Sequence, residues 1–303
     1  MESLVITNSM KYSYQSCPRK FFYSYIRKLT PVKTPEPLFW GGLVHEVLEI
    51  FDIAGLNGVD DWIEEKREEA EAESNALSPA DLEQLDSMLT ALPNVVAGYA
   101  LKWKDSVYET IATEKQFSIQ LAEGIRFEGK IDGIISLPLQ DGTKGKQIML
   151  LERKTAARTG DMYYSSLALN NQLRGYLLGM KELGYDTGCW VLYDVIKKPQ
   201  IRGRVGETAE SIAKRTGEAY LTDHQSLYER TQIKLSEQVV AEYKDELISF
   251  ARELQRAMES GEYIRAHPLP HQLSWCSFYG LCTGGDTGSQ FTTRTKLHPE
   301  LAE

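Results

Sequence analysis

Two acidic residues and a lysine have the residue types and the spacing that could do chemistry. Asp132 ends the segment Gly129-Lys130-Ile131-Asp132, and Glu152 and Lys154 flank Arg153 further along the chain. A hairpin with its tip near residue 143 would place position 132 roughly opposite position 154. Side chains at i and i+2 of a strand share a face, so Glu152 and Lys154 point the same way. We therefore expect Asp132, Glu152 and Lys154 to converge on one side of a sheet.

This arrangement suits phosphodiester hydrolysis. Carboxylate oxygens are the ligands that hard cations such as Mg²⁺ and Mn²⁺ prefer. A bound cation lowers the pKa of a water and neutralises the charge that grows on the phosphate. Lys154 would orient the attacking water or stabilise the phosphate oxygens. The alternative is a solvated hairpin with three unrelated polar residues, because such triplets are common.

Two helical segments carry further polar pairs. His45 and Glu49 lie one helical turn apart in the segment GGLVHEVLE, and His45 could complete a metal site from a neighbouring helix. A zinc-protease motif is excluded, because it would need a second histidine at position 49. Gln172 and Tyr176 also stand at i and i+4, where they could hold a phosphate or a base. Each pair taken alone is more often structural.

Strands and helices must position these residues. The patterns predict strands over residues 113–121, 125–137, 147–152 and 187–196. They predict helices over residues 9–28, 40–53, 81–113, 167–183 and 232–260, with Gly41-Gly42 opening the second of them, and an irregular end. Strands flanked by helices indicate an α/β fold with a mixed sheet, preceded by a mostly helical N-terminal region.

The composition suits one large core and no membrane span. Of the 303 residues, 42% are hydrophobic and 25% are charged, which suffices for one core with at most a modest appendage. No apolar run reaches the roughly 18 residues of a membrane helix, and the start MESLVITNS lacks a signal pattern. We expect a soluble, cytoplasmic protein without a membrane partner.

The net charge of −9 does not by itself favour nucleic acid. The excess acid concentrates in residues 60–86, however, and phosphate is held by a local patch rather than by the average charge. The aromatic residues among 21–25 could stack bases or pack in the core. Basic residues gather in two other places, at Arg19, Lys20, Arg27, Lys28 and Lys33, and at Lys197, Lys198, Arg202 and Arg204.

The order of the motifs resembles that of the RecB-type PD-(D/E)XK nucleases. This group includes the AddB nuclease domain, CRISPR-associated RecB-like exonucleases and phage homologues. The resemblance runs from Ser9 to Cys282, and glutamate stands at position 152 where many members have aspartate. The matching segments are Gly41-x-x-x-His45, Gly129-x-Ile131-Asp132, Glu152-x-Lys154-Thr155 and Gln172-x-x-x-Tyr176.

The resemblance implies a restriction-endonuclease-like core and a metal-dependent DNA nuclease, an exonuclease on single-stranded or end-exposed DNA in recombination, repair or phage DNA processing. His45, Asp132 and Glu152 would hold Mg²⁺ or Mn²⁺, Lys154 would be catalytic, and Gln172, Tyr176 and Glu49 would support them. Residues 1–303 would form one nuclease domain, with a helical insertion at about 54–112 and a cysteine-containing segment at about 261–303.

Other functions fit the same residues. One alternative is a non-catalytic module of nuclease fold that binds DNA ends or serves assembly, although such copies tend to lose Asp132, Glu152 or Lys154. Another is a nuclease that processes CRISPR spacers. The chain has no G-x-x-x-x-G-K-S/T sequence, so a helicase or recombination partner would be a separate polypeptide.

The cysteines match a cluster-binding pattern only in part. The iron–sulfur members of the family have one cysteine before the catalytic domain and three after it. Cys17, Cys276 and Cys282 match three of these positions, but the fourth falls at Leu273. An altered iron–sulfur cluster, a Zn²⁺ site completed by His267 or His271, or free thiols are the alternatives. The spacing also predicts that the C-terminal segment meets the N-terminal helix. Cys189 lies inside a predicted apolar strand, so we expect it to be a small buried core residue.

Overall fold

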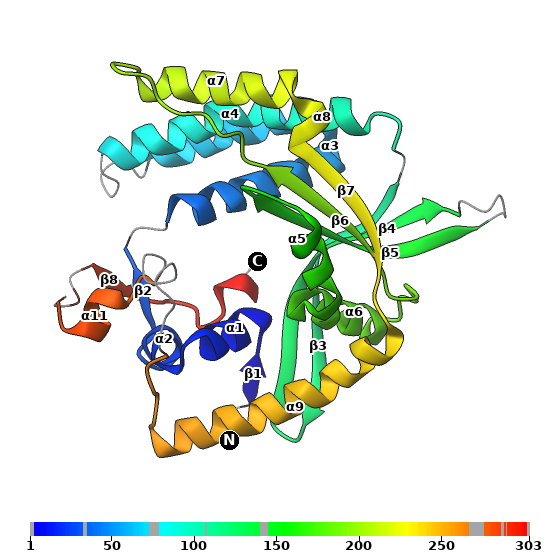
Figure 1. Cartoon of the computed structure of the whole chain (residues 1–303), viewed down its shortest axis with the longest axis vertical. Coiled ribbons are helices and arrows are strands. Elements are labelled where there is room, and N and C mark those ends of the chain that lie inside the picture. The colour runs from blue at the N-terminus through cyan, green and yellow to red at the C-terminus, as the bar shows by residue number, and fades with distance from the viewer. Residues whose placement is uncertain are drawn as a thin grey trace.

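A six-stranded mixed sheet crosses the centre of the molecule (Figure 1). The computed structural model describes residues 3–32, 35–72, 79–106, 108–139, 145–266, 276–285, 288 and 290–301. Strand β4 pairs with β3 along one edge and with β1 and β5 along the other, and β5 leads to β6 and β7. The strands are β1 (Leu4–Ile6), β3 (Glu109–Ala122), β4 (Ile125–Pro138), β5 (Lys146–Ala156), β6 (Trp190–Lys197) and β7 (Tyr228–Lys234).

The relative direction of neighbouring strands follows from the connections between them. The long β3–β4 hairpin and the β4–β5 pair are antiparallel, whereas β5 and β6 run parallel because α6 crosses between them. The central strands carry continuous apolar runs, since helices cover both of their faces. The expected mixed sheet flanked by helices is thus confirmed.

Helices α1 (Asn8–Ser16), α6 (Asn171–Glu182) and α9 (Glu237–Ser260) cover one face of the sheet (Figure 1). Their apolar side chains and those of the strands form the larger core. Helix α9 contributes a stripe at helical spacing, which is why it lies flat across this face. The stripe comprises Val240, Tyr243, Leu247, Phe250, Ala251, Leu254 and Ala257.

Helices α3 (Glu36–Ala72), α4 (Pro79–Trp103) and α7 (Ala209–Thr222) stack together over the other side (Figure 1). A second core fills this layer, and it includes the buried residues Val44, Leu92 and Tyr228. Helix α3 is kinked at Gly55, whose φ of 69° and ψ of −164° are not helical. A side chain there would be strained, because positive φ favours glycine. The kink separates a first segment that faces the sheet from a second that packs on α4.

Several expected boundaries are wrong. Helix α3 begins at Glu36, so Gly41-Gly42 lies inside it and does not open it. The helix expected over 81–113 ends at Trp103, and Glu109 already belongs to β3. The helix expected from residue 232 starts at Glu237, because residues 228–234 form the edge strand β7. Strand β1 and helix α7 were not expected.

The two ends of the chain meet, as the cysteine spacing predicted. Strand β2 (Leu29–Pro31) pairs with β8 (Phe291–Thr293) in a second, two-stranded sheet. The ring of Tyr23 stacks on Phe278 at 5.5 Å between centroids. Around these contacts lie the helices α2 (Pro18–Phe21) and α11 (Tyr279–Thr283), the π-helix Phe22–Ile26 and the 3-10 helix Pro299–Leu301. The remaining short helices are α5 (Asp161–Ser165), α8 (His224–Leu227) and the 3-10 helix Ser166–Leu169.

None of the helices within the described ranges is both long enough and apolar enough to cross a membrane.

Candidate active site

The three central residues lie where strands β4 and β5 part. The paired residues of these two strands end at Gly133–Leu151, while β5 continues beside β6 as far as Ala156. This register puts Asp132 next to Glu152, two residues away from the predicted partner, Lys154. Asp132, Glu152 and Lys154 still lie on one side of the sheet, because a shift of two residues keeps every side chain on its face. The fork leaves the side chains of Asp132 and Lys154 partly exposed, by 16% and 31%.

Glu152 is a buried carboxylate whose partner is the ammonium of Lys154. Its side chain is 0% exposed, Lys154 Nζ contacts Oε1 as an ion pair, and Oε2 has no hydrogen-bond partner among the described residues. Burial, followed by the nearby Asp132 carboxylate, raises the pKa of Glu152 to about 8. Buried carboxylates normally find partners, so Glu152 is held in a state that a cation would stabilise.

Lys154 sits above this carboxylate. Burial lowers the pKa of the Lys154 ammonium, but the charges of Glu152 and Asp132 outweigh that effect and raise it. The lysine therefore keeps its charge at neutral pH. The hydroxyl groups of Tyr163 and Tyr193 lie 3.0 Å apart beside it, and Tyr163 also favours the charged lysine.

His45 reaches the fork from helix α3. Its Nδ1 lies 3.5 Å from Oδ2 of Asp132. Burial lowers the pKa of the His45 imidazole, against the opposing effect of Asp132, so the ring is neutral and able to bind a cation at neutral pH. Gly41, one turn before His45, explains the close approach of the helix: a Cβ there would lie 3.1 Å from Oγ1 of Thr155.

Gln172 and Tyr176 approach from α6, on the other side of the fork. Asn170 caps this helix by accepting hydrogen bonds from the backbone N–H groups of Gln172 and Leu173. Gln172 Nε2 donates to Tyr176 Oη at 3.0 Å. Burial, followed by the Glu152 and Asp132 carboxylates, raises the pKa of Tyr176 well above its usual value. The structure thus brings all the residues of the four motifs to one place.

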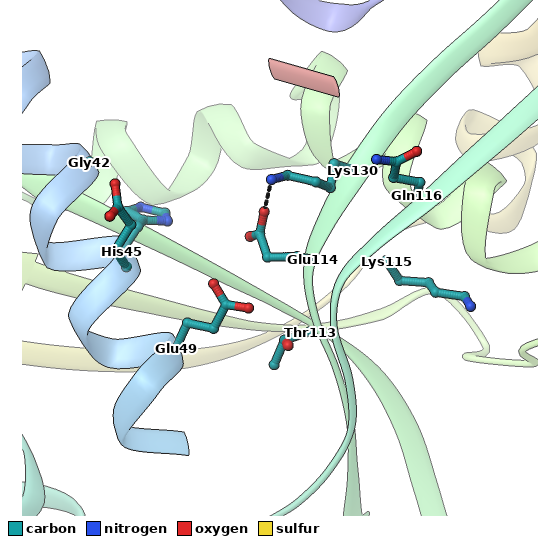
Figure 2. Close-up of a pocket in the computed structure, with 9 residues that line it drawn as sticks. Gly42, His45, Glu49, Thr113, Glu114, Lys115, Gln116 and Lys130 are labelled. Carbon is teal, nitrogen blue, oxygen red and sulfur yellow. Dashed lines mark ion pairs between the residues drawn. The ribbon is translucent and has the colours of Figure 1, made fainter. Parts of the chain in front are cut away.

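A cleft of about 780 Å³ opens beside the fork, between α3 and the β3–β4 hairpin. Figure 2 shows His45 and Glu49 on the helix facing Glu114 and Lys130 on the strands. Lys130 forms an ion pair with Glu114 across the hairpin. The lining consists of Gly42, His45, Glu46, Glu49, Thr113, Glu114, Lys115, Gln116 and Lys130.

Glu114 also belongs to this group of acidic residues, although the sequence patterns did not predict it as a site residue. The pairs Thr113–Gly133 and Lys115–Ile131 place it opposite Asp132. Burial raises the pKa of Glu114, and the carboxylates of Asp132 and Glu49 add to this effect against Lys130. Its position could have been found by pairing the two strands that the sequence did predict. Glu114 therefore adds a carboxylate to the same acidic surface.

The residues present fit a divalent cation. A buried carboxylate and a second carboxylate offer the oxygen ligands that Mg²⁺ or Mn²⁺ prefers, and a neutral imidazole beside them could add a nitrogen ligand. Within the ranges that the structure describes, no three His, Cys, Asp or Glu side chains are already gathered closely enough to hold a metal ion. The side chains instead approach in pairs, His45 with Asp132 and Glu152 with Lys154.

The cysteines were predicted to bind a cluster or a zinc ion near the two ends of the chain. Cys17 Sγ accepts a hydrogen bond from Ala266 N–H at 3.4 Å, and Cys282 Sγ accepts one from Arg265 Nε at 3.3 Å, so both lie beside the same short segment. The described cysteines do not form a metal-binding set, and residues 267, 271 and 273 lie outside the described ranges. A cluster or zinc ion stays a prediction. Cys189 lies just before β6 with a φ of 60° and is half-buried, so its expected place within the strand is wrong.

Some of the basic residues that gather at two places in the sequence form ion pairs within the fold. Lys197 and Lys198 form ion pairs with Glu229 and Glu36, and Lys33 lies outside the described ranges. Among the aromatic residues near Arg19, Phe21 is fully buried and Tyr25 is 6% exposed. Core packing is therefore the role of these two rings, and the base-stacking alternative is wrong for them.

Comparison with known proteins identifies the family. No curated protein matches the chain. One similar solved structure, from Eubacterium rectale, carries a provisional exonuclease name; it is 9% identical, with a TM-score of 0.44 over 88% of this chain and 86% of the other. The sequence model described as the PD-(D/E)XK nuclease superfamily matches residues 9–283, nearly the whole length. The chain belongs to the PD-(D/E)XK nuclease superfamily.

Proposed function

We propose that the protein is a metal-dependent DNA nuclease, and an exonuclease on single-stranded or end-exposed DNA. One observation carries the proposal: Glu152 is fully buried with the Lys154 ammonium as its partner on Oε1, has no partner on Oε2 among the described residues, and lies at a strand fork beside Asp132 and His45. The exonuclease mode and a role in recombination, repair or phage DNA processing rest on the resemblance to RecB-type nucleases. We also propose that this activity takes place in the cytoplasm.

The residues divide into two groups by role. His45, Asp132 and Glu152 would hold Mg²⁺ or Mn²⁺, which when bound supplies a water of lowered pKa and neutralises phosphate charge. Lys154 stays charged, so it can orient the attacking water and stabilise the phosphate oxygens. Gln172 and Tyr176 hold each other in place beside it and offer polar groups to the substrate. Glu49 lines the cleft and supports the acidic surface.

The cleft supports a nucleic acid as the substrate. Lys115, Gln116 and Lys130 lie on its strand side, where they can hold phosphate groups next to the fork. The acidic wall from α3 faces them, and a bound cation would lower its repulsion for DNA. A separate helicase or recombination partner would supply strand separation where duplex DNA is the substrate.

The same proposal covers the domain arrangement. Residues 1–303 would form a single nuclease domain, with the helical insertion at about 54–112 and the cysteine-containing segment at about 261–303. The kink at Gly55 supports the first boundary, since it divides α3 into a sheet-facing part and a part that packs on α4. The pairing of β2 with β8 supports the attachment of the second segment.

The test uses end-labelled linear DNA, single- and double-stranded, with Mg²⁺, Mn²⁺ or EDTA. We expect metal-dependent cleavage, lost by at least about 100-fold in Lys154→Ala. Lys146→Ala is the matched control, because Lys146 lies on the same strand with 60% of its side chain exposed. Cleavage of circular single-stranded DNA would reject the exonuclease mode. DNA binding without cleavage under either metal would reject catalysis and favour a non-catalytic end-binding module.

A further inference from the structure

One face of α3 carries a row of polar residues toward the sheet. His45, Glu49 and Asp52 stand at i, i+4 and i+7, which places them on one side of the helix within about two turns. His45 lies beside Asp132, and Glu49 lines the cleft. Asp52 is different, because its side chain is only 6% exposed and does not line the cleft. The row therefore begins in the candidate active site and ends in the interior.

Asp52 meets the side chain of Arg153 there. Arg153 Nη2 lies 2.5 Å from Asp52 Oδ2, and the arginine side chain is 3% exposed. Tyr108 joins the pair: its hydroxyl accepts from Arg153 Nη2 at 3.1 Å and donates to Asp52 Oδ1 at 3.3 Å. Removing water strengthens such a charged contact and makes its geometry more definite.

The backbone of Arg153 faces the site on the opposite side. Its N–H group donates to Asp132 Oδ2 at 3.4 Å, and the ring of His45 makes a hydrogen bond to the Arg153 backbone. Arg153 also stands between Glu152 and Lys154. Arg153 thus contacts two of the three expected metal ligands, Asp132 and His45, through its backbone, and the helix that carries His45 through its side chain.

A second contact fixes the other end of this helical segment. Gly41 packs against Thr155 of the same strand, and the segment ends soon after Asp52 at the kink of Gly55. His45 lies between the Gly41 and Asp52 contacts. A helix held at two points cannot slide or roll, so the imidazole keeps its place relative to Asp132 and Glu152.

We infer that the Asp52–Arg153 ion pair, with Tyr108, is a positioning device that sets the metal affinity of the site. The inference rests on the proposed function. Neither charged group touches the substrate or the cation. The pair holds α3 on β5 so that His45, Asp132 and Glu152 can bind the same ion. Groups that orient metal ligands typically change affinity 10- to 100-fold when they are lost.

The experiment measures Mn²⁺ binding by calorimetry without DNA, beside the Mn²⁺ dependence of DNA cleavage. We expect Asp52→Asn to weaken Mn²⁺ binding by about 10-fold. Cleavage at saturating Mn²⁺ should fall far less. Arg153→Lys keeps a charge near Asp52 and should retain more affinity than Arg153→Met. Tyr108→Phe keeps both charges and should weaken binding by only about 2- to 3-fold.

Tyr228→Phe is the control. It removes a buried hydrogen bond to the Val95 carbonyl, 2.6 Å long, in the same helical layer. The ring of Tyr228 lies outside the Asp52–Arg153–Tyr108 group and packs on Tyr99, which in turn lies beside Arg153. The change should lower stability and leave the Mn²⁺ affinity unchanged. If Asp52→Asn does not fold, the milder Tyr108→Phe decides. Unchanged affinity in the folded Tyr108 and Asp52 variants, or an equal loss in Tyr228→Phe, would overturn the inference alone. A wild-type protein that neither binds Mn²⁺ nor cleaves DNA would overturn the proposed function with it.

Discussion

Two buried carboxylates on neighbouring strands of the sheet have opposite surroundings. Glu152 on β5 and Asp194 on β6 are both 0% exposed. Asp194 Oδ2 accepts hydrogen bonds from Tyr99 Oη at 2.6 Å and from Arg230 at 2.8 Å, and the same arginine lies over the ring of Trp103. Glu152 has only the contact with Lys154. Burial of a carboxyl group is therefore common to both places, and the smaller number of donors distinguishes the candidate site.

The two groups of charged residues differ in whether their charges are neutralised within the protein. The Asp194 network joins β6, β7 and α4, and its charges are neutralised within the protein. The Glu152 group has an excess of acid, with Asp132, Glu114 and Glu49 nearby. An uncompensated acidic group costs stability, and a bound cation can recover that cost. Stability measurements can therefore separate structural charges from functional ones.

The largest effect is expected from Asp194→Asn. The change keeps the shape of the side chain but leaves the Arg230 charge buried without a counter-ion. We expect the free energy of unfolding to fall by about 3–5 kcal/mol. Urea unfolding in EDTA measures it. A loss below about 1 kcal/mol would show that the paired network is not what holds this layer together.

The second effect is stabilisation by the cation. Mn²⁺ at about 100 times its dissociation constant should raise the free energy of unfolding by about 2.7 kcal/mol. Glu152→Gln should abolish most of this gain, and Asp194→Asn should keep it. Thermal unfolding with and without Mn²⁺ gives the comparison. An equal gain in Glu152→Gln would place the cation elsewhere.

The smallest effect is the pH dependence that Glu152 itself causes. Its pKa of about 8 lies above the usual 4.5, so between pH 4.5 and 8 the folded protein holds a proton that the unfolded chain has lost. The contribution of Glu152 to the free energy of unfolding therefore falls as the pH rises through this window. In EDTA, Glu152→Gln should remove this fall, which urea unfolding of both proteins between pH 4.5 and 8 measures. A variant whose stability falls as steeply as that of the wild type over this window would contradict the raised pKa of Glu152.

Local patterns in the sequence predicted the central strands that carry the motif residues. Strands β4 and β5 were found because their apolar runs are bounded by turn formers, and the side-chain period of two brought Glu152 and Lys154 to one face. The register was wrong by two residues, since its turn was located only approximately. The edge strand β7 was missed because its polar and apolar residues lead into α9 with little between them.

Features that depend on distant partners were not predictable in this way. Gly41 was expected to begin a helix, whereas its role is to let α3 approach Thr155. The Arg153–Asp52 pair joins residues far apart in the chain, and no local pattern marks either of them. Glu114 gains its meaning only from its place opposite Asp132. Such relations appear only when the strand register and the helix orientation are known.

The closure between the first and last segments of the chain has a consequence for folding. Strand β2 pairs with β8, and Thr7 Oγ1 donates to Glu300 at 2.5 Å. During synthesis, residues 29–31 leave the ribosome long before residues 291–293 exist. Contacts between such distant positions form late and slowly. Strand β2 should therefore reach its final position only after residues 291–293 have been made, whereas β1 and α1 can already pack against β4 and the core.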